Sequence, residues 1–147
     1  MGSSGNLANF KNVDTAGTAN YNTNPISAGN NSYEVFLLGH LTGTFNRIDG
    51  FRFWMSTNYS PSTGLHVFFS GQHPIYLQPA NGTSSIATSS IPVADPGSTN
   101  VTIGGSLSGS LVASGYTDNL VLQLRTDTNA PAGDTSLATF TLTYNEN

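Results

Sequence analysis

Carboxylates are the side chains of this sequence that could carry out acid–base or hydrolytic chemistry. Hydrolysis by a carboxylate pair needs two carboxyl groups about 5–10 Å apart. Most of the acids here stand beside Gly, Pro or Asn, where a carboxylate caps a turn, and Glu34 is expected within a strand with its side chain in solvent. No spacing predicts a catalytic pair. The eight acids are Asp14, Glu34, Asp49, Asp95, Asp118, Asp127, Asp134 and Glu146.

A serine motif and three histidines could serve nucleophilic or metal chemistry. Residues 105–109 (Gly-Ser-Leu-Ser-Gly) match the letters of the Gly-x-Ser-x-Gly nucleophile elbow. That elbow lies between a strand and a helix, whereas this match lies in a Gly/Ser-rich β region. His40, His66 and His73 lack the i, i+2 spacing that puts two ligands on one strand face. The sequence therefore predicts neither a triad nor a histidine metal site.

Calcium binding and zinc binding by cysteine are the two other metal chemistries that the residue types can indicate. The run 127–129 together with Asp134 offers oxygen ligands in one loop, but it lacks the bidentate Glu of an EF-hand calcium site. The sequence contains no Cys, which excludes thiolate catalysis and cysteine zinc sites. We expect a protein that is not an enzyme and has no cofactor or metal.

Aromatic side chains are the strongest candidates for binding. If Phe51, Phe53 and Met55 face a core, strand alternation turns Arg52 and Trp54 to the other face. Trp and Arg are enriched at interface hot spots, and a Trp also stacks on sugar rings. The alternatives for Trp54 are cover by a loop or by the N-terminal arm, or a bulge that turns it inward. The predicted binding residues are Arg52, Trp54, Phe68, Phe69 and Tyr76.

Adjacent Phe68 and Phe69 cannot both face one core, because neighbouring strand residues point to opposite faces. One of the two rings must be covered by a loop or by another subunit. This pair therefore favours a protein that packs against a partner.

The elements that position these residues are predicted to be strands. Charged residues are 8% of the chain, against about 25% in a typical soluble domain; Ser, Thr, Asn and Gly supply the polarity and disfavour helices. Short alternating runs recur between turn signals such as Asp49-Gly50, at a spacing typical of a sandwich. The expected strands are Tyr33–Thr44 and residues 51–55, 65–70, 72–78, 85–91, 120–125 and 138–144, with a weaker one at 7–13. Residues 101–111 are expected to form two short strands or one bulged strand.

The domain organisation follows from this pattern. Residues 1–31 form a polar, flexible or extended N-terminal arm, and residues 32–147 form a single antiparallel β-sandwich domain. The net charge of −4 and four scattered cations exclude nucleic acid and anionic membrane surfaces as partners, because both require a basic patch.

The C-terminal third carries a family resemblance. Residues 119–124 (Asn-Leu-Val-Leu-Gln-Leu), 130–134 (Ala-Pro-Ala-Gly-Asp) and 138–144 (Ala-Thr-Phe-Thr-Leu-Thr-Tyr) resemble the closing strand pair of bacterial and viral immunoglobulin-like domains. The expected fold is therefore an immunoglobulin-like sandwich closed by a hairpin from Leu120 to Tyr144, with a jelly roll as the alternative.

The wider chain is similar to small structural proteins of tailed phages, in which segments like 33–37 and 48–54 follow one another. This resemblance implies a virion protein, either a capsid decoration (cement) protein or an accessory head or tail protein. Its partners would be other virion proteins and copies of itself, as a homo-oligomer or trimer. A carbohydrate-binding module centred on Trp54 is the alternative function, with a glycan as its ligand.

Overall fold

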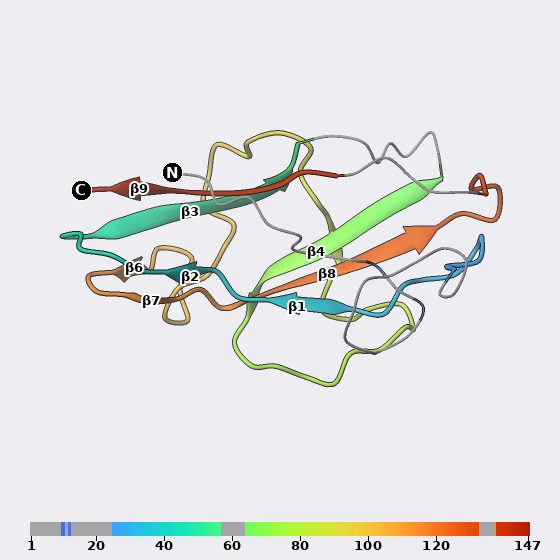
Figure 1. Cartoon of the computed structure of the whole chain (residues 1–147), viewed down its shortest axis with the longest axis horizontal. Helices are drawn as coiled ribbons and strands as arrows, with labels where there is room; N and C mark the ends of the chain where they lie inside the picture. Colours follow the sequence, from blue (N-terminus) through green and yellow to red (C-terminus); the bar gives the residue numbers. More distant parts are fainter. Residues whose placement is uncertain (1–9, 11, 13–24, 57–63, 133–137) are drawn as a thin grey trace.

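The computed structural model describes residues 10, 12, 25–56, 64–132 and 138–147. This part of the chain contains nine β-strands and no helix (Figure 1). The all-β expectation is confirmed. Most of the predicted arm, residues 1–9, 11 and 13–24, lies outside the described residues, and so does most of the weak strand expected at 7–13. The strands are β1 (Val35–Leu37), β2 (His40–Leu41), β3 (Ile48–Met55), β4 (Leu65–His73), β5 (Ser89–Ser90), β6 (Ser110–Leu111), β7 (Gly115–Tyr116), β8 (Asn119–Thr126) and β9 (Phe140–Glu146).

The strands form antiparallel sheets that do not close into a barrel. The larger sheet has the order β1-β8-β4-β5, a second has the order β6-β3-β9, and β2 pairs with β7. Figure 1 shows β3 and β9 along one side of the molecule and β4, β8 and β1 along the other. The core fills the space between them, an arrangement consistent with a β-sandwich.

The core is built from the alternation of β3 and β4. Phe51, Phe53 and Met55 are buried, as the sequence pattern predicts, and Phe69 of β4 meets Phe53 with ring centres 6.3 Å apart. Full burial of such a side chain stabilises the fold by about 1.5–3 kcal/mol. These contacts bind the two sheets together.

The Asp49-Gly50 signal marks a bulge and not a turn, which corrects the prediction. β3 runs through both residues, and its pairing with β9 shifts register between Asp49 and Arg52. Gly50 has a φ of +63°, and a side chain there would meet Asn145. A bulge with glycine in the left-handed region bends the strand without ending it.

Two predicted strands differ from those in the structure. The strand expected at Tyr33–Thr44 is divided into β1 and β2 at Gly39, whose amide donates to Thr117 Oγ1 at 2.8 Å. The strand expected at 72–78 is absent, because β4 ends at His73 and Pro74 has no N–H to continue a ladder.

The expected hairpin from Leu120 to Tyr144 is also wrong. β8 is flanked by β1 and β4, which leaves it no free edge, and β9 pairs with β3 in the other sheet. The connection therefore crosses from one sheet to the other. Of the strand expected at 85–91, only the short β5 forms. The stretch 101–111, expected as two short strands or one bulged strand, contains β6 and a bridge between Ile103 and Ser106.

Residues 25–31, the described end of the expected flexible or extended arm, lie along the edge of the larger sheet. Gly29 N donates to Asp127 O at 3.0 Å, and Thr126 N donates to Asn30 O at 3.1 Å. Asn31 forms a bridge with Arg125. This stretch therefore continues β1 along the end of β8.

Candidate functional site

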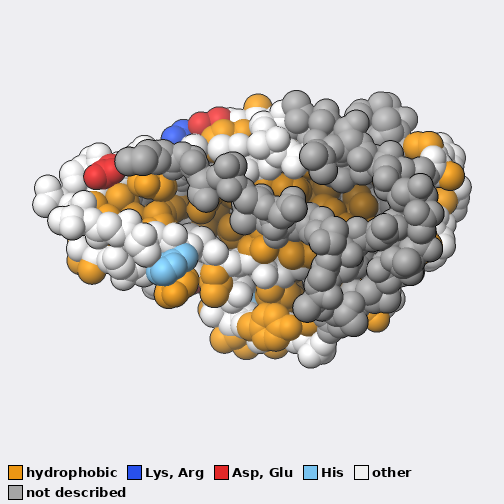
Figure 2. All heavy atoms as spheres, in the orientation of Figure 1, with side chains coloured by type: hydrophobic (Ala, Val, Ile, Leu, Met, Phe, Trp, Pro, Cys, Tyr) orange, Lys and Arg blue, Asp and Glu red, His pale blue; other side chains and the backbone are white. Residues whose placement is uncertain are grey.

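A group of apolar side chains, most of them exposed, lies on the outer side of β1 and on the loop that follows β4. We call it the β1 patch. Phe36 meets Tyr76 edge-on with ring centres 5.1 Å apart, and Tyr76 is 62% exposed. Figure 2 shows hydrophobic side chains gathered on the surface in this region, below β1 in the view of Figure 1. The patch comprises Phe36, Leu38, Ile75, Tyr76 and Leu77.

Local geometry explains why these side chains face solvent. Val35 and Leu37 of β1 pack against the core, so alternation turns Phe36 and Leu38 outward. After β4 the chain turns at His73, whose Nδ1 lies 2.5 Å from the Ile75 carbonyl oxygen. The His73 ring in turn lies 6.0 Å from that of Phe36. The loop is therefore held against β1 with its apolar side chains outward.

Of the five predicted binding residues, Tyr76 lies in the β1 patch. Phe68 and Phe69 point to opposite faces of β4, and Phe69 is buried in the core. The half-buried Phe68 ring is covered by the Arg125 guanidinium at 3.9 Å, and its backbone pairs with Ser90 of β5. The cover over this ring comes from the same chain.

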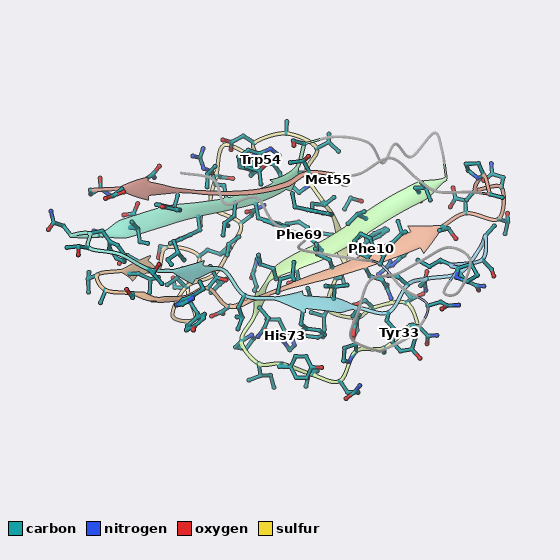
Figure 3. The ribbon with its side chains drawn as sticks, in the orientation of Figure 1. Phe10, Tyr33, Trp54, Met55, Phe69 and His73 are labelled. Carbon is teal, nitrogen blue, oxygen red and sulfur yellow. The ribbon has the colours of Figure 1, made fainter. Side chains whose placement is uncertain are left out.

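Arg52 and Trp54 lie on β3, in the other sheet. The Arg52 guanidinium binds both carboxylate oxygens of Asp95, at 2.9 and 3.2 Å. Trp54 is half-buried opposite Thr141, and in the described part of the chain it makes no ring–ring contact. Figure 3 shows Trp54 beside β3 and His73 on the far side of β1. The structure therefore does not unite the five residues in one site.

Glu34 departs from the sequence expectation. Its side chain is buried and not in solvent: Ser84 Oγ donates to Oε1 at 2.5 Å and Ala80 N donates to Oε2 at 3.2 Å. Glu34 N also donates to Ala80 O at 3.0 Å. The carboxylate thus fastens the loop after the β1 patch to the edge of β1. Nothing in the sequence pairs Glu34 with Ser84, which is 50 residues away.

A second set of polar contacts holds the same loop over β8. Arg125 donates to the carbonyl oxygens of Ser84 and Ala87 at 3.2 and 2.8 Å, and to Gln123 Oε1 at 3.0 Å. Burial lowers the pKa of Arg125 by removing water from the guanidinium; an arginine nevertheless stays charged. The buried Gln123 amide donates to Ser32 O and Gly82 O. These groups stabilise the loop.

The histidines and the serine motif considered for catalysis or metal binding contact neighbouring side chains. His66 pairs with Asp127 at 3.1 Å, and His40 stacks on Tyr116 at 4.3 Å. Ser106 Oγ bonds to Ser108 Oγ at 2.9 Å. Asp134, one of the oxygen ligands considered for calcium, lies outside the described residues. Among those described, no group of three or more His, Asp or Glu side chains could hold a metal ion.

A polar cavity of about 310 Å³ lies where the chain enters β1. Asparagine dominates its wall, and no hydrogen bond among the described residues engages the side-chain amides of Asn30, Asn31 or Asn81. Neutral amides both donate and accept hydrogen bonds. The lining residues are Asn12, Pro25, Ile26, Ser27, Gly29, Asn30, Asn31 and Asn81.

Comparison with known proteins gives no relative: no family model, no curated protein and no solved structure matches this chain. In the described ranges no helix is long and apolar enough to cross a membrane. What the structure shows at the β1 patch is a set of mostly exposed apolar side chains, with the Phe36 and Tyr76 rings in contact.

Proposed function

We propose that this chain is a structural protein of a virion, a capsid decoration or accessory head or tail protein, which binds a neighbouring subunit and catalyses no reaction. The observation that carries the proposal is the β1 patch, in which Ile75, Tyr76 and Leu77 are 59%, 62% and 42% exposed. Contiguous apolar patches on a soluble protein mark interaction surfaces. The likeness of segments 33–37 and 48–54 to tailed-phage structural proteins supports the virion setting.

The energetics of the patch suit an assembly protein. Full burial of each large apolar side chain contributes about 1.5–3 kcal/mol, so several side chains docked together supply a useful binding energy. Only 8% of the residues are charged, so the association depends little on salt. A partner that binds only the folded state raises its stability by mass action.

The finer fold and the assembly state belong to the same proposal. The fold is an immunoglobulin-like sandwich, with a jelly roll as the alternative; crossings between the sheets from β3 to β4 and from β8 to β9 support it. Copies join as a homo-oligomer, with a trimer as the first expectation, in the virion particle.

Replacement of the patch tests this function. The double variant Ile75→Ser and Tyr76→Ser should keep the melting temperature of the parent and lose its association, measured by light scattering over a concentration series. Val112→Ser is the matched control, because Val112 is 71% exposed and lies outside the patch. Unchanged association of the double variant, or equal loss in the control, would overturn the proposal.

The carbohydrate-binding alternative now rests on the asparagine-lined cavity and not on Trp54. Amides without partners among the described residues suit the hydroxyl groups of a neutral sugar. Binding to an array of immobilised glycans tests it. Loss of a glycan signal on Asn30→Ala and Asn81→Ala, with none lost on Trp54→Ala, would support this function, and no signal for the parent chain would reject it.

A further inference from the structure

Asn81 and Gly82 are the one Asn-Gly pair of the sequence, and they lie in the loop between β4 and β5. Both residues are exposed, and the chain bends at each of them. Figure 1 shows the chain after β4 passing below β1. In an Asn-Gly pair the side-chain amide can approach the next backbone nitrogen closely, because glycine has no Cβ and adopts most backbone angles. The pair therefore places an electrophilic amide carbon beside a nitrogen that can attack it.

Both reacting groups are without hydrogen-bond partners in the part of the chain that the structure describes. No hydrogen bond there engages the side-chain amide of Asn81 or the backbone nitrogen of Gly82. A Cβ added at Gly82 would meet nothing within 4 Å, so the surrounding chain does not crowd this backbone. Asn100 differs, because its side chain donates to Phe53 O and accepts from Phe53 N, each at 2.8 Å. The Asn81 amide can therefore rotate toward Gly82 N, whereas the Asn100 amide is fixed.

We propose that Asn81 is a site of spontaneous deamidation, at which the folded chain modifies its own loop. The backbone nitrogen of Gly82 gives up its proton and forms a bond to Asn81 Cγ. The bond from Cγ to the side-chain nitrogen breaks, and that nitrogen takes the proton and leaves as ammonia. Water then opens the cyclic succinimide at either of its carbonyl carbons, which gives aspartate or isoaspartate. Nothing is oxidised or reduced, and water is the co-reactant.

Isoaspartate at position 81 lengthens the backbone between two anchored residues. Ala80 is bound to the edge of β1, because Glu34 N donates to Ala80 O at 3.0 Å and Ala80 N donates to Glu34 Oε2 at 3.2 Å. On the other side, Gly82 O accepts from Nε2 of the buried Gln123 at 2.6 Å. The isoaspartyl linkage carries the chain through the former side chain and adds one methylene group between these anchors. The spacing no longer matches both of them, so the loop loosens at one.

The same conversion changes the asparagine-lined cavity, because Asn81 is part of its wall. An amide donates and accepts hydrogen bonds, whereas a carboxylate only accepts them. The cavity therefore loses a donor, and a chain of net charge −4 gains one more negative charge. Neither effect requires a partner, so this inference does not rest on the proposed docking function.

Incubation of the full chain at physiological temperature and mildly alkaline pH tests the reaction. Peptide mapping by mass spectrometry should show the amide-to-acid mass gain at Asn81 and not at Asn100, at a rate that rises with pH because the attacking nitrogen must lose its proton. Gly82→Ala is the matched variant, since its methyl group meets no other part of the fold but restricts the backbone angles that ring closure needs. Its rate should be lower by about tenfold, which is about 1.4 kcal/mol of activation free energy. Reaction of Asn81 only in chain unfolded by urea, or equal rates in the parent and Gly82→Ala, would overturn the proposal.

Hydrogen exchange tests the structural consequence. The isoaspartate form is separated by ion-exchange chromatography and identified by enzymatic methylation of its isoaspartyl carboxylate. The amides of residues 80–87 should exchange faster in this form than in Asn81→Asp, which has the same charge and an unlengthened backbone. Equal exchange in the two forms would show that both anchors survive the added methylene group, and would overturn the loosening of the loop.

Discussion

The guanidinium of Arg125 lies 3.9 Å from the centre of the Phe68 ring. Because of this contact, the Phe68 ring on the outer face of the larger sheet is covered by a side chain of its own chain. Arg125 also binds the backbone of the 84–87 loop, so one side chain covers the ring and fixes the loop beside it. A partly desolvated cation–π contact contributes about 1–2 kcal/mol.

Arg125→Ala should lower the free energy of unfolding by about 2–3 kcal/mol, because it removes charge-assisted hydrogen bonds and the cation–π contact together. Urea denaturation followed by tryptophan fluorescence measures the change. Arg47→Ala is the matched control: Arg47 makes an exposed ion pair with Asp49 at 3.0 Å, which contributes less than about 1 kcal/mol. Equal effects of the two substitutions would contradict the role given to Arg125.

Glu34→Ala should lower the free energy of unfolding by about 1–3 kcal/mol, because it leaves the Ser84 hydroxyl and the Ala80 amide without their acceptor. Glu34→Gln keeps one acceptor oxygen and should recover part of this loss. Hydrogen exchange of the amides of residues 80–87 is the more specific measurement. Exchange there should accelerate in Glu34→Ala while β3 stays protected; uniform acceleration throughout would argue against a local fastening of the loop.

Gly50→Ala should destabilise the fold by about 1–2 kcal/mol, since alanine at a φ of +63° is strained and its methyl group meets Asn145. Gly82→Ala is the control, because a methyl group at Gly82 would meet nothing within 4 Å. The difference between the two midpoints in urea isolates the backbone requirement of the bulge. A neutral Gly50→Ala would show that β3 can lose its bulge at little cost.

The sequence could predict the features that depend on alternation alone. Buried Phe51, Phe53 and Met55 follow from a period of two, and so do the opposite faces of Phe68 and Phe69. Strand partners could not be predicted, because pairing is set by contacts between distant segments. β8 carries apolar residues on both faces since it is central in its sheet, and that centrality is what excludes a hairpin with β9.

The candidate site was only partly predictable for the same reason. The sequence predicts Tyr76 as a binding residue, but its contact with Phe36 of β1 exists only in the folded chain. Glu34 was placed in solvent because nothing in a local pattern reveals a loop that crosses the strand edge. Contacts between residues that are 40 or more positions apart in the sequence, such as Glu34 with Ala80, leave no recognisable pattern in a single sequence.

Substitution of the adjacent residues Phe68 and Phe69 compares the stability contribution of a core ring with that of a ring covered by Arg125. Phe69→Ala should lower the free energy of unfolding by about 3–5 kcal/mol, because it opens a cavity beside Phe53 in the core. Phe68→Ala should lower it by about 1–2 kcal/mol, because that ring is half-buried and loses chiefly its contact with Arg125. Combining Phe68→Ala with Arg125→Ala should cost less than the sum of the single changes, since both remove one interaction. Strict additivity in that double-mutant cycle would show that the two side chains contribute independently, and the Arg125 cover would then have no energetic coupling to the ring beneath it.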